Sequence, residues 1–344
     1  MSKAKIARRD FIKVAGASAA ALGAGGIPLG GAQGAPEQGT KREGKQFPKL
    51  ALITLFSRPK LAFAAQTGYE GVVVKINRDL DPDFSDSQID QVLAISRETQ
   101  CPIISIECMG DARGKDLNHI APDPGERRER QEYFIRCLEF AHRLGCKFVG
   151  TFSGGIPGAT LDRQAKALAE AFNERYLPVC EKLGLSMGWE NYPTTYNFAS
   201  TPAAYEAVFS QVASPLLGLE FDPSHFVRQY IDPYQTAWDF QDRIRGVHFK
   251  DTEITQPILQ QVGINGHGWW RYRIPGQGLM DWPKFITVLL QVKFAGGAAV
   301  EHEDPFWDEP PSNNAPEFPP ARKDGFILAE RFLRQYLPGR LART

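Results

Sequence analysis

The sequence predicts an α/β protein built as a single (β/α)8 TIM barrel, and three observations lead to this fold class. Short apolar runs alternate with segments of helical periodicity along most of the 344 residues, as expected for parallel strands with helical connections. The runs are continuously apolar rather than alternating, which indicates strands that are buried on both faces. Four of the runs end in an acidic or histidine side chain, and the C-terminal strand ends of a barrel all face one mouth.

Eight apolar runs are predicted as strands. They are rich in Val, Ile, Leu and Phe, and most are bounded by Gly, Pro, Asp or Asn, which favour turns. In chain order they are residues 49–56, 69–77, 102–109, 146–153, 185–190, 217–222, 245–248 and 297–301.

Helical spacing of apolar residues predicts seven helices between and after these strands. Gly145 and Gly184 end two of them, and Thr201 and Asp281 are suited to cap the start of two others. Pro178 should kink the longest one because it has no N–H to donate. The helices are residues 87–99, 126–144, 161–183, 201–212, 233–243, 281–294 and 322–336.

Residues 251–280 show no clear periodicity, and loops of that length in compact barrels are usually functional lids or binding loops. The aromatic rings of Trp269 and Trp270 offer stacking surface for a sugar, and Arg271 and Arg273 offer fixed donors. Substrate contact is therefore predicted for Trp270, Arg271 and Arg273. The alternative is that these side chains only pack the long loop down.

Glu190, Asp222, His248 and Glu301 stand at the ends of the fifth to eighth predicted strands and should meet at the barrel mouth. Three carboxylates and one imidazole suit a single divalent ion such as Mn²⁺, Mg²⁺ or Co²⁺ better than a structural zinc. Other roles stay open: a salt bridge for Glu190, a turn-capping Asp222, a core His248. Glu303 points the same way as Glu301 and competes with it as the ligand.

These residues resemble the site of the xylose-isomerase-like TIM barrels, which include the ketose 3-epimerases, over residues 48–340. In that family a Glu ends the fifth strand, Asp-x-x-His the sixth, a His the seventh and a Glu the eighth. Glu190, Asp222 with His225, His248 and Glu301 match in this order. The resemblance implies a sugar isomerase or epimerase that acts on a keto-sugar through a metal-bound enediolate. Glu190 and Glu301 would bind the ion and exchange a proton with the substrate, and His225 would face a substrate oxygen.

The chain departs from the ketose 3-epimerases after two of its motifs. The ketose 3-epimerases usually carry an Arg shortly after the seventh-strand His, where this chain has Lys250. They also carry a second acidic residue just after the fifth-strand Glu, where this chain has Pro193 to Tyr196. Lys250 is expected to donate to a substrate hydroxyl or carbonyl. A larger keto-sugar fits better, and the same site could act as a 3-keto-glycoside lyase by β-elimination. A non-catalytic sugar-binding protein is the rival from another class.

The composition and the N-terminal residues limit which partners the protein is expected to have. Lys+Arg and Asp+Glu are both 40, which argues against a nucleic-acid partner and against the DNA-repair endonucleases that share this barrel. Residues 7–13, Ala-Arg-Arg-Asp-Phe-Ile-Lys, indicate a twin-arginine signal peptide over 1–34, followed by a linker over 35–47. The expected partners are a carbohydrate and the twin-arginine export machinery, the location periplasmic or secreted, with no membrane anchor. A homo-oligomer stays open.

The remaining titratable side chains are expected to be structural. The five cysteines have no metal-binding spacing and are predicted as buried thiols. His119 and His267 are expected in solvent or loops rather than as ligands.

Overall fold

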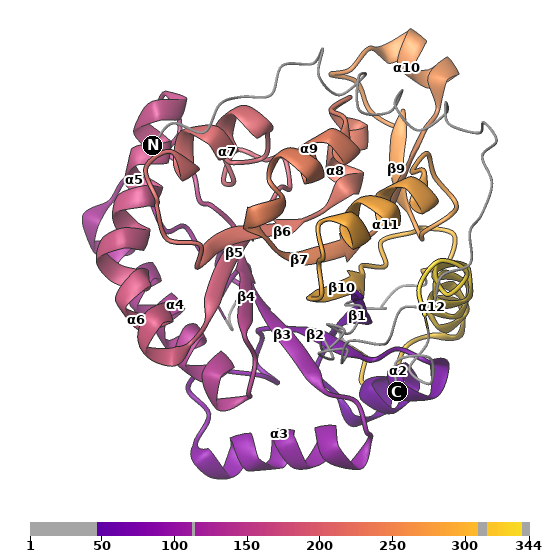
Figure 1. Cartoon of the computed structure of the whole chain (residues 1–344), viewed down its shortest axis with the longest axis horizontal. Coiled ribbons are helices and arrows are strands. Elements are labelled where there is room, and N and C mark those ends of the chain that lie inside the picture. Colours follow the sequence, from indigo (N-terminus) through magenta and orange to yellow (C-terminus); the bar gives the residue numbers. More distant parts are fainter. Residues whose placement is uncertain (1–46, 112–113, 309–314, 339–344) are drawn as a thin grey trace, which may run out of the picture. The chain divides into compact units, whose positions relative to one another are not determined.

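The computed structural model describes residues 47–111, 114–308 and 315–338. Eight parallel strands close into a barrel in the order β1-β10-β7-β6-β5-β4-β3-β2, which confirms the predicted fold class (Figure 1). The barrel strands are β1 (Lys49–Leu55), β2 (Gly71–Lys75), β3 (Ile103–Cys108), β4 (Phe148–Thr151), β5 (Ser186–Glu190), β6 (Leu217–Phe221), β7 (Ile244–Phe249) and β10 (Gly297–Val300).

The predicted signal peptide, residues 1–34, lies outside the described residues, as does the predicted linker apart from Phe47. Among the helices that the structure does describe, none is both long enough and apolar enough to cross a membrane.

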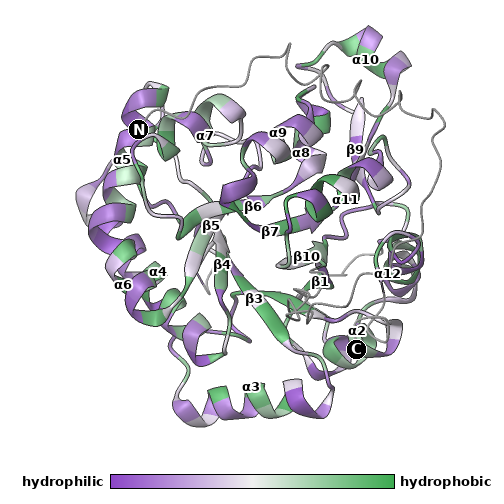
Figure 2. Cartoon of the chain, viewed as in Figure 1, coloured by the Kyte–Doolittle hydropathy of each residue, from purple (hydrophilic) through white to green (hydrophobic). Residues whose placement is uncertain are grey.

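Helices surround the barrel and turn their polar sides outward, while the strands between them are mostly apolar (Figure 2). Two predicted caps are present: the side chains of Thr201 and Asp281 accept from the backbone N–H of Ala204 and Lys284. The surrounding helices are α2 (Arg58–Thr67), α3 (Asp86–Glu98), α4 (Pro124–Arg143), α5 (Leu161–Ala171), α6 (Leu177–Leu183), α7 (Pro202–Phe209), α8 (Pro223–Arg228), α9 (Pro233–Asp239), α11 (Trp282–Gln291) and α12 (Pro320–Leu333).

Two of these helices were not predicted from periodicity. α8 has only six residues, too few to show a helical repeat. α2 has a weak apolar stripe, but its start carries the usual signals, because Ser57 caps it and Pro59 lies in its first turn. Capping chemistry was therefore the better guide to α2.

The longest predicted helix is interrupted before Pro178, as expected. α5 ends at Ala171, a π-helical turn covers Phe172–Tyr176, and α6 continues to Leu183. Pro178 has no N–H to donate to the preceding turn, and the wider π turn takes up the break in the hydrogen-bond ladder.

The segment 251–280 is not an irregular loop, so that prediction was wrong. It forms an antiparallel ribbon of β8 (Asp251–Ile254) and β9 (Trp270–Arg273), with α10 (Gln256–Val262) between the two strands. The two ribbon strands, Asp-Thr-Glu-Ile and Trp-Arg-Tyr-Arg, lack the continuous apolar run that revealed the barrel strands, and four residues are too short to show a period. In Figure 1, α10 projects beyond the ring of helices.

Inside the barrel, side chains change from apolar to charged from the N-terminal toward the C-terminal strand ends. Ala51, Ile53, Val73 and Ala299 form a small apolar cluster, whereas Lys75 and Glu301 follow Val73 and Ala299 on the same faces two residues further along the chain. Gly150 makes room for this charged layer: a Cβ there would lie 2.0 Å from Glu220 Oε2. The interior thus carries the site that the strands were predicted to build.

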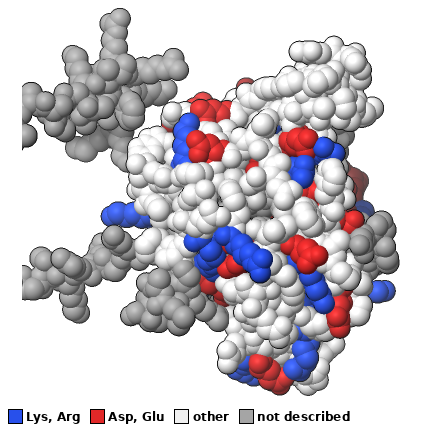
Figure 3. All heavy atoms as spheres, turned by 90° about the vertical axis from the view of Figure 1, so that its right-hand side faces the viewer, with Lys and Arg blue, Asp and Glu red and all other residues white. Residues whose placement is uncertain are grey.

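All five cysteines are free and buried, which confirms the predicted thiols. His119 lies in the loop between β3 and α4, which agrees with one of its two predicted settings, but it is fully buried rather than in solvent. His267 is exposed, as expected. On the face shown in Figure 3, Lys and Arg side chains lie next to Asp and Glu side chains, so the described surface there is mixed in charge.

Candidate functional site

The structure brings together the four predicted metal ligands. One ligand atom from each of Glu190, Asp222, His248 and Glu301 lies within 4.8 Å of every other, and all four residues are buried. They come from the C-terminal ends of β5, β6, β7 and β10, so the barrel closure places them side by side. His248 is central: its Nδ1 lies 3.2 Å from Glu190 Oε1, 3.3 Å from Glu301 Oε2 and 3.5 Å from Asp222 Oδ2.

Asp222 uses its two oxygens for different purposes. Oδ1 accepts from the backbone N–H of Ser224 at 2.8 Å and caps α8. Oδ2 is buried and accepts no hydrogen bond of regular geometry from the described residues, although the Lys250 ammonium lies 3.0 Å away. The capping role and the ligand position, treated as alternatives from the sequence, therefore coexist.

Glu301 and Glu303 occupy different environments. Glu301 belongs to the buried group, whereas the side chain of Glu303 is 46% exposed and contacts Lys250 at 3.0 Å. Because Glu303 comes after β10 has ended at Val300, the strand alternation that would aim it inward no longer holds there. The geometry favours Glu301 as the ligand.

Two lysines neutralise this carboxylate group. Lys250 Nζ lies 2.7 Å from Glu301 Oε2 and 3.9 Å from Glu190 Oε1, and it is buried. Lys75, at the end of β2, reaches Glu301 Oε1 at 2.8 Å. Each oxygen of Glu301 therefore faces a different ammonium.

A second pair of carboxylates lies beneath His248. Its Nε2 is 3.3 Å from Glu107 Oε1 and 3.4 Å from Glu220 Oε1, and both glutamates are almost fully buried. Burial raises the pKa of Glu220 to about 8, the positive His248 opposes this shift, and Glu107 adds to it. Glu220 therefore holds a proton at neutral pH, which spares the site one buried negative charge.

His225 is oriented by the ribbon. Tyr272 Oη lies 2.8 Å from Arg228 Nη1 and 2.7 Å from His225 Nδ1. A guanidinium can only donate hydrogen bonds, so the Tyr272 hydroxyl accepts one from Arg228 and donates one to His225 Nδ1. Nε2 of His225 then carries the ring proton and donates to Glu190 Oε1 at 2.9 Å.

The ligand carboxylates stay ionised despite their burial. Burial and the charge of Glu301 raise the pKa of Glu190, but His248 and the hydrogen bonds from His225 and His248 outweigh them and lower it to about 2. Burial also raises the pKa of Glu301, and Lys250 with Lys75 bring it well below its usual range. Both side chains can therefore accept a proton at neutral pH.

The three predicted substrate residues of the ribbon are not part of the carboxylate group. The guanidinium of Arg273 donates hydrogen bonds to Asp304, Glu253 and Gln277. Arg271 forms a bidentate ion pair with Glu253. These contacts favour the alternative that the arginines pack the segment down. Trp270 lies nearer the site, with its ring 4.9 Å from that of Tyr272 and under the Arg228 guanidinium.

Four further site residues were missed from the sequence: Lys75, Glu107, Glu220 and Tyr272. Period-2 alternation offers a signal for Glu220, which precedes Asp222 by two residues on the same face. Lys75 ends β2, as Glu190 ends β5, and Glu107 is the penultimate residue of β3. Tyr272 carried no signal, because its position depends on a ribbon that the pattern did not reveal.

The donor set fits a divalent cation of the kind predicted. Three ionised carboxylates and one imidazole nitrogen converge, they are all buried, and Asp222 Oδ2 has no regular hydrogen bond to satisfy it. Oxygen-rich sets of this composition suit Mn²⁺, Mg²⁺ or Co²⁺, and no cysteine belongs to the described group.

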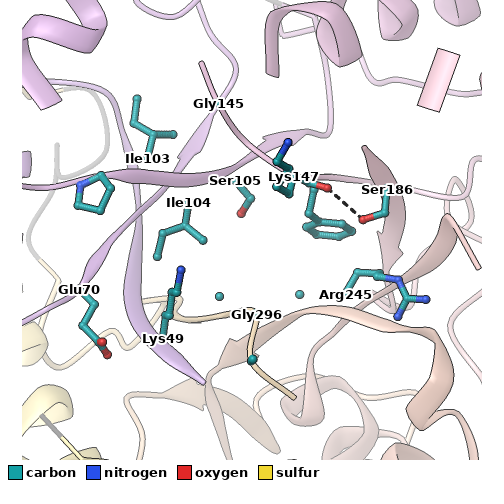
Figure 4. Close-up of a pocket in the computed structure, with 15 residues that line it drawn as sticks. Lys49, Glu70, Ile103, Ile104, Ser105, Gly145, Lys147, Ser186, Arg245 and Gly296 are labelled. Atoms are coloured by element: carbon teal, nitrogen blue, oxygen red, sulfur yellow. Dashed lines mark hydrogen bonds between the residues drawn. The ribbon is translucent and has the colours of Figure 1, made fainter. Parts of the chain in front are cut away.

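Two cavities lie at opposite ends of the barrel. A cavity of about 530 Å³ at the N-terminal strand ends has Lys49, Lys147 and Arg245 around it, and the Ser186 hydroxyl donates to the Lys147 carbonyl beside it (Figure 4). A second cavity, of about 240 Å³, is lined by Lys75 and Glu301 and so adjoins the carboxylate group. Only the second can serve the chemistry, because the ligands sit at the C-terminal strand ends.

Comparisons with known proteins agree with this architecture. A family model described as xylose isomerase-like TIM barrel matches residues 61–319. An inosose dehydratase of Bacillus cereus (strain AH820) is 24% identical over 191 residues, which cover 51% of this chain and 63% of the dehydratase. The match therefore spans less than two thirds of that relative's length.

Solved structures share the fold at low identity. The structure of a D-psicose 3-epimerase in the presence of D-fructose gives a TM-score of 0.65 at 15% identity, over 85% of this chain and 100% of that chain. A 3-keto-D-glucoside 4-epimerase from E. coli, in its apo form, gives 0.61 at 16% identity, over 84% of this chain and 99% of that chain.

Proposed function

The chain belongs to the xylose isomerase-like TIM barrel family, and from the geometry of its site we propose that it is a metal-dependent isomerase or epimerase of a keto-sugar. Its relatives and structural neighbours include a sugar epimerase and a dehydratase. The observation that carries the proposal is the meeting of Glu190, Asp222, His248 and Glu301 in one buried group.

Glu190 and Glu301 form the acid/base pair of this proposal. In the barrel order, β5 and β10 are separated by β6 and β7, so the two carboxylates approach a ligand from different strands. Both are ionised at neutral pH for the reasons given above, so either can take a proton from a carbon next to a carbonyl, and the other can return one.

The neighbouring donors handle the charge that develops on the substrate oxygen. Lys250 is buried and positive, and burial, which lowers its pKa, is outweighed by Asp222, Glu301 and Glu303, which keep it well above the usual value. His225, held by Tyr272, offers its Nε2 proton in the same region. A bound divalent ion would supply Lewis-acid stabilisation of that oxygen.

Elimination is the second candidate. Abstraction of a proton beside a carbonyl also precedes loss of a β-substituent, so the same residues could serve a dehydratase or a 3-keto-glycoside lyase. The inosose dehydratase relative favours this candidate.

The decisive experiment is NMR in D₂O with purified, metal-loaded protein and a panel of keto-sugars, 3-keto-glycosides and inososes. We expect deuterium to enter at a carbon beside the carbonyl. An epimer or isomer as product supports the first candidate, and a released water or aglycone supports elimination. Glu190→Gln and Glu301→Gln should each lower the exchange rate by roughly 10²–10⁴.

Glu206→Gln on exposed α7 is the matched control, because it removes a carboxylate far from the group. Exchange that survives both site substitutions would overturn the acid/base assignment. Sugars that bind without any exchange would instead identify a sugar-binding protein.

We also propose that residues 1–34 export the folded chain by the twin-arginine route to the periplasm or the medium, with residues 35–47 as a linker to the barrel domain. The motif at Arg8 and Arg9 supports this. Changing both arginines to lysine should retain the protein inside the cell, as fractionation and immunoblotting would show. Unchanged export would contradict the proposal.

A further inference from the structure

The cavity of about 240 Å³ beside Glu301 is lined by three cationic side chains. Lys60 from α2, Lys75 from β2 and Arg322 from α12 all line it, although these elements are far apart in the sequence. Lys60 and Arg322 are 2% and 7% exposed, so two of the three charges are deeply buried at its wall.

The two buried cations influence one another. Burial and the positive charge of Arg322 lower the pKa of Lys60 to about 8, and the negative charge of Asp79 only partly opposes this shift. Arg322 donates to the His302 carbonyl at 2.8 Å and pairs with Asp308 at 2.9 Å, while its Nε finds no hydrogen-bond partner among the described residues.

The acidic residues of the same cavity are already neutralised. Glu301 accepts from Lys75 at 2.8 Å and from Lys250 at 2.7 Å, and Glu303 accepts from Lys250 at 3.0 Å. The imidazole of His302 also lines the cavity. Both of its ring nitrogens are buried without a hydrogen-bond partner among the described residues.

We propose that this cavity receives a carboxylate of the substrate, so that the enzyme acts on an acidic keto-sugar such as a keto-aldonate or a uronate. The proposal rests on the proposed function, because it extends the substrate from the proton-transfer site at Glu301 into the adjoining cavity. A carboxylate there forms charge-assisted hydrogen bonds with Lys60 and Arg322.

A phosphate is the other common anion of sugars, and the cavity is less suited to it. Phosphate groups are often held by free backbone N–H groups at a helix N-terminus. α12, which brings Arg322 to the cavity, begins at Pro320 and has Pro319 as its cap residue, so neither the cap nor the first helical residue has an N–H to offer.

The test compares D-gluconate with D-glucitol, which have the same carbon chain and differ at one end by the carboxylate. Isothermal titration calorimetry on the Mn²⁺-loaded full chain should show gluconate binding roughly tenfold or more tightly. A carboxylate can also ligate the ion directly, so the variants decide where it binds. Lys60→Met should remove most of the preference, and Lys60→Arg should retain it.

Lys147→Met is the matched control, since it removes an exposed cation at the opposite cavity. Thermal unfolding checks that each variant is folded, and Lys60→Gln replaces Lys60→Met if the latter is not. Equal binding of the two ligands, or a preference that survives loss of the Lys60 charge, would overturn the inference. Tighter binding of glucitol 6-phosphate than of gluconate would also overturn it in favour of a phosphate site.

Deuterium exchange separates this inference from the proposed function. If neutral keto-sugars exchange as fast as their acids, the proposed function stands and the inference falls. If no sugar exchanges but the gluconate preference depends on Lys60, the anion site stands and the proposed function falls.

Discussion

At the scale of single residues, the site depends on side chains that face two ways. Asp222 caps α8 with one oxygen and faces the ligand group with the other. Glu301 meets Lys75 with Oε1 and Lys250 with Oε2. His248 faces the ligand carboxylates with its Nδ1, and its Nε2 faces Glu107 and Glu220. Each of these side chains is held in place by contacts outside the ligand group.

The sequence predicted four ligand residues at strand ends, but it missed Lys75 at the end of β2 and the residues that act through others. Glu190, Asp222 and His248 each follow an apolar run, so their convergence follows from barrel geometry alone. Tyr272 and Arg228 orient His225 through a contact between segments about 45 residues apart. Such a contact has no periodicity, and no spacing rule could have revealed it.

His119 gives a pH prediction for stability. His119 Nε2 donates a hydrogen bond to Thr151 Oγ1, and the Thr151 hydroxyl donates to the Cys108 carbonyl. His119 Nδ1 accepts a hydrogen bond from the Tyr176 hydroxyl. Burial lowers the pKa of His119 to about 3, whereas an unfolded histidine titrates near 6.5. Below about pH 6.5 the unfolded chain binds a proton that the folded chain does not, so this stabilisation is lost as the pH falls toward 3.

We therefore expect His119→Gln to be less stable than the natural chain at pH 7.5 and the difference to narrow by roughly 2 kcal/mol at pH 5. Urea unfolding at several pH values measures it. His142→Gln, on the exposed end of α4, should show no such convergence. A difference that stays constant with pH would contradict the assignment.

At the scale of elements, the buried carboxylate of Asp251 helps to join the β8–β9 ribbon to the barrel. Asp251 accepts from the backbone N–H of Thr252, Gly276 and Met280 and from Trp282 Nε1, so both of its oxygens are filled. Burial raises the pKa of Asp251, and these four donors oppose that shift. The residue thus ties the start of the ribbon to its return and to α11.

Asp251→Asn should lower the free energy of unfolding by roughly 2–3 kcal/mol, because an amide nitrogen would face donors where an oxygen accepted. Urea unfolding measures the loss, and limited proteolysis should show faster cleavage within residues 256–268.

Asp281→Asn is the control for this substitution. Asn caps a helix about as well as Asp, so the capping of α11 is preserved and stability should change little. Equal effects of the two substitutions would show that Asp251 has no special anchoring role.

The barrel strands were predictable because they are continuously apolar, and the long helices because their apolar residues repeat, whereas several short elements had neither signal. All eight barrel strands fall within or beside their predicted ranges, for example β5 at Ser186–Glu190. α8, α10 and both ribbon strands have four to seven residues each. One or two turns cannot display a period, so tertiary contacts alone define these pieces.

At the scale of the whole molecule, closure of the barrel joins four separate strand ends into one site. Binding of a divalent ion should therefore stabilise the entire domain, since the unfolded chain offers no assembled ligands. Saturating Mn²⁺ at about 100 times its Kd should add roughly 2.7 kcal/mol to the free energy of unfolding. Differential scanning calorimetry should show a rise of several degrees in Tm, reversed by a chelator.

Asp222→Asn is the sharpest variant for this experiment. It keeps an oxygen to cap α8 but removes the ligand charge. We expect it to abolish the Mn²⁺ shift with little change in metal-free Tm, whereas Glu206→Gln should keep the full shift. A Tm that ignores Mn²⁺ in the natural chain would contradict the metal site.

Lys250 lies among the ligand oxygens, 3.0 Å from Asp222 Oδ2 and 2.7 Å from Glu301 Oε2. The chain thus places a cation of its own among these carboxylates. A divalent ion that binds these oxygens would replace the Lys250 ammonium, and the lysine side chain would have to move away from them.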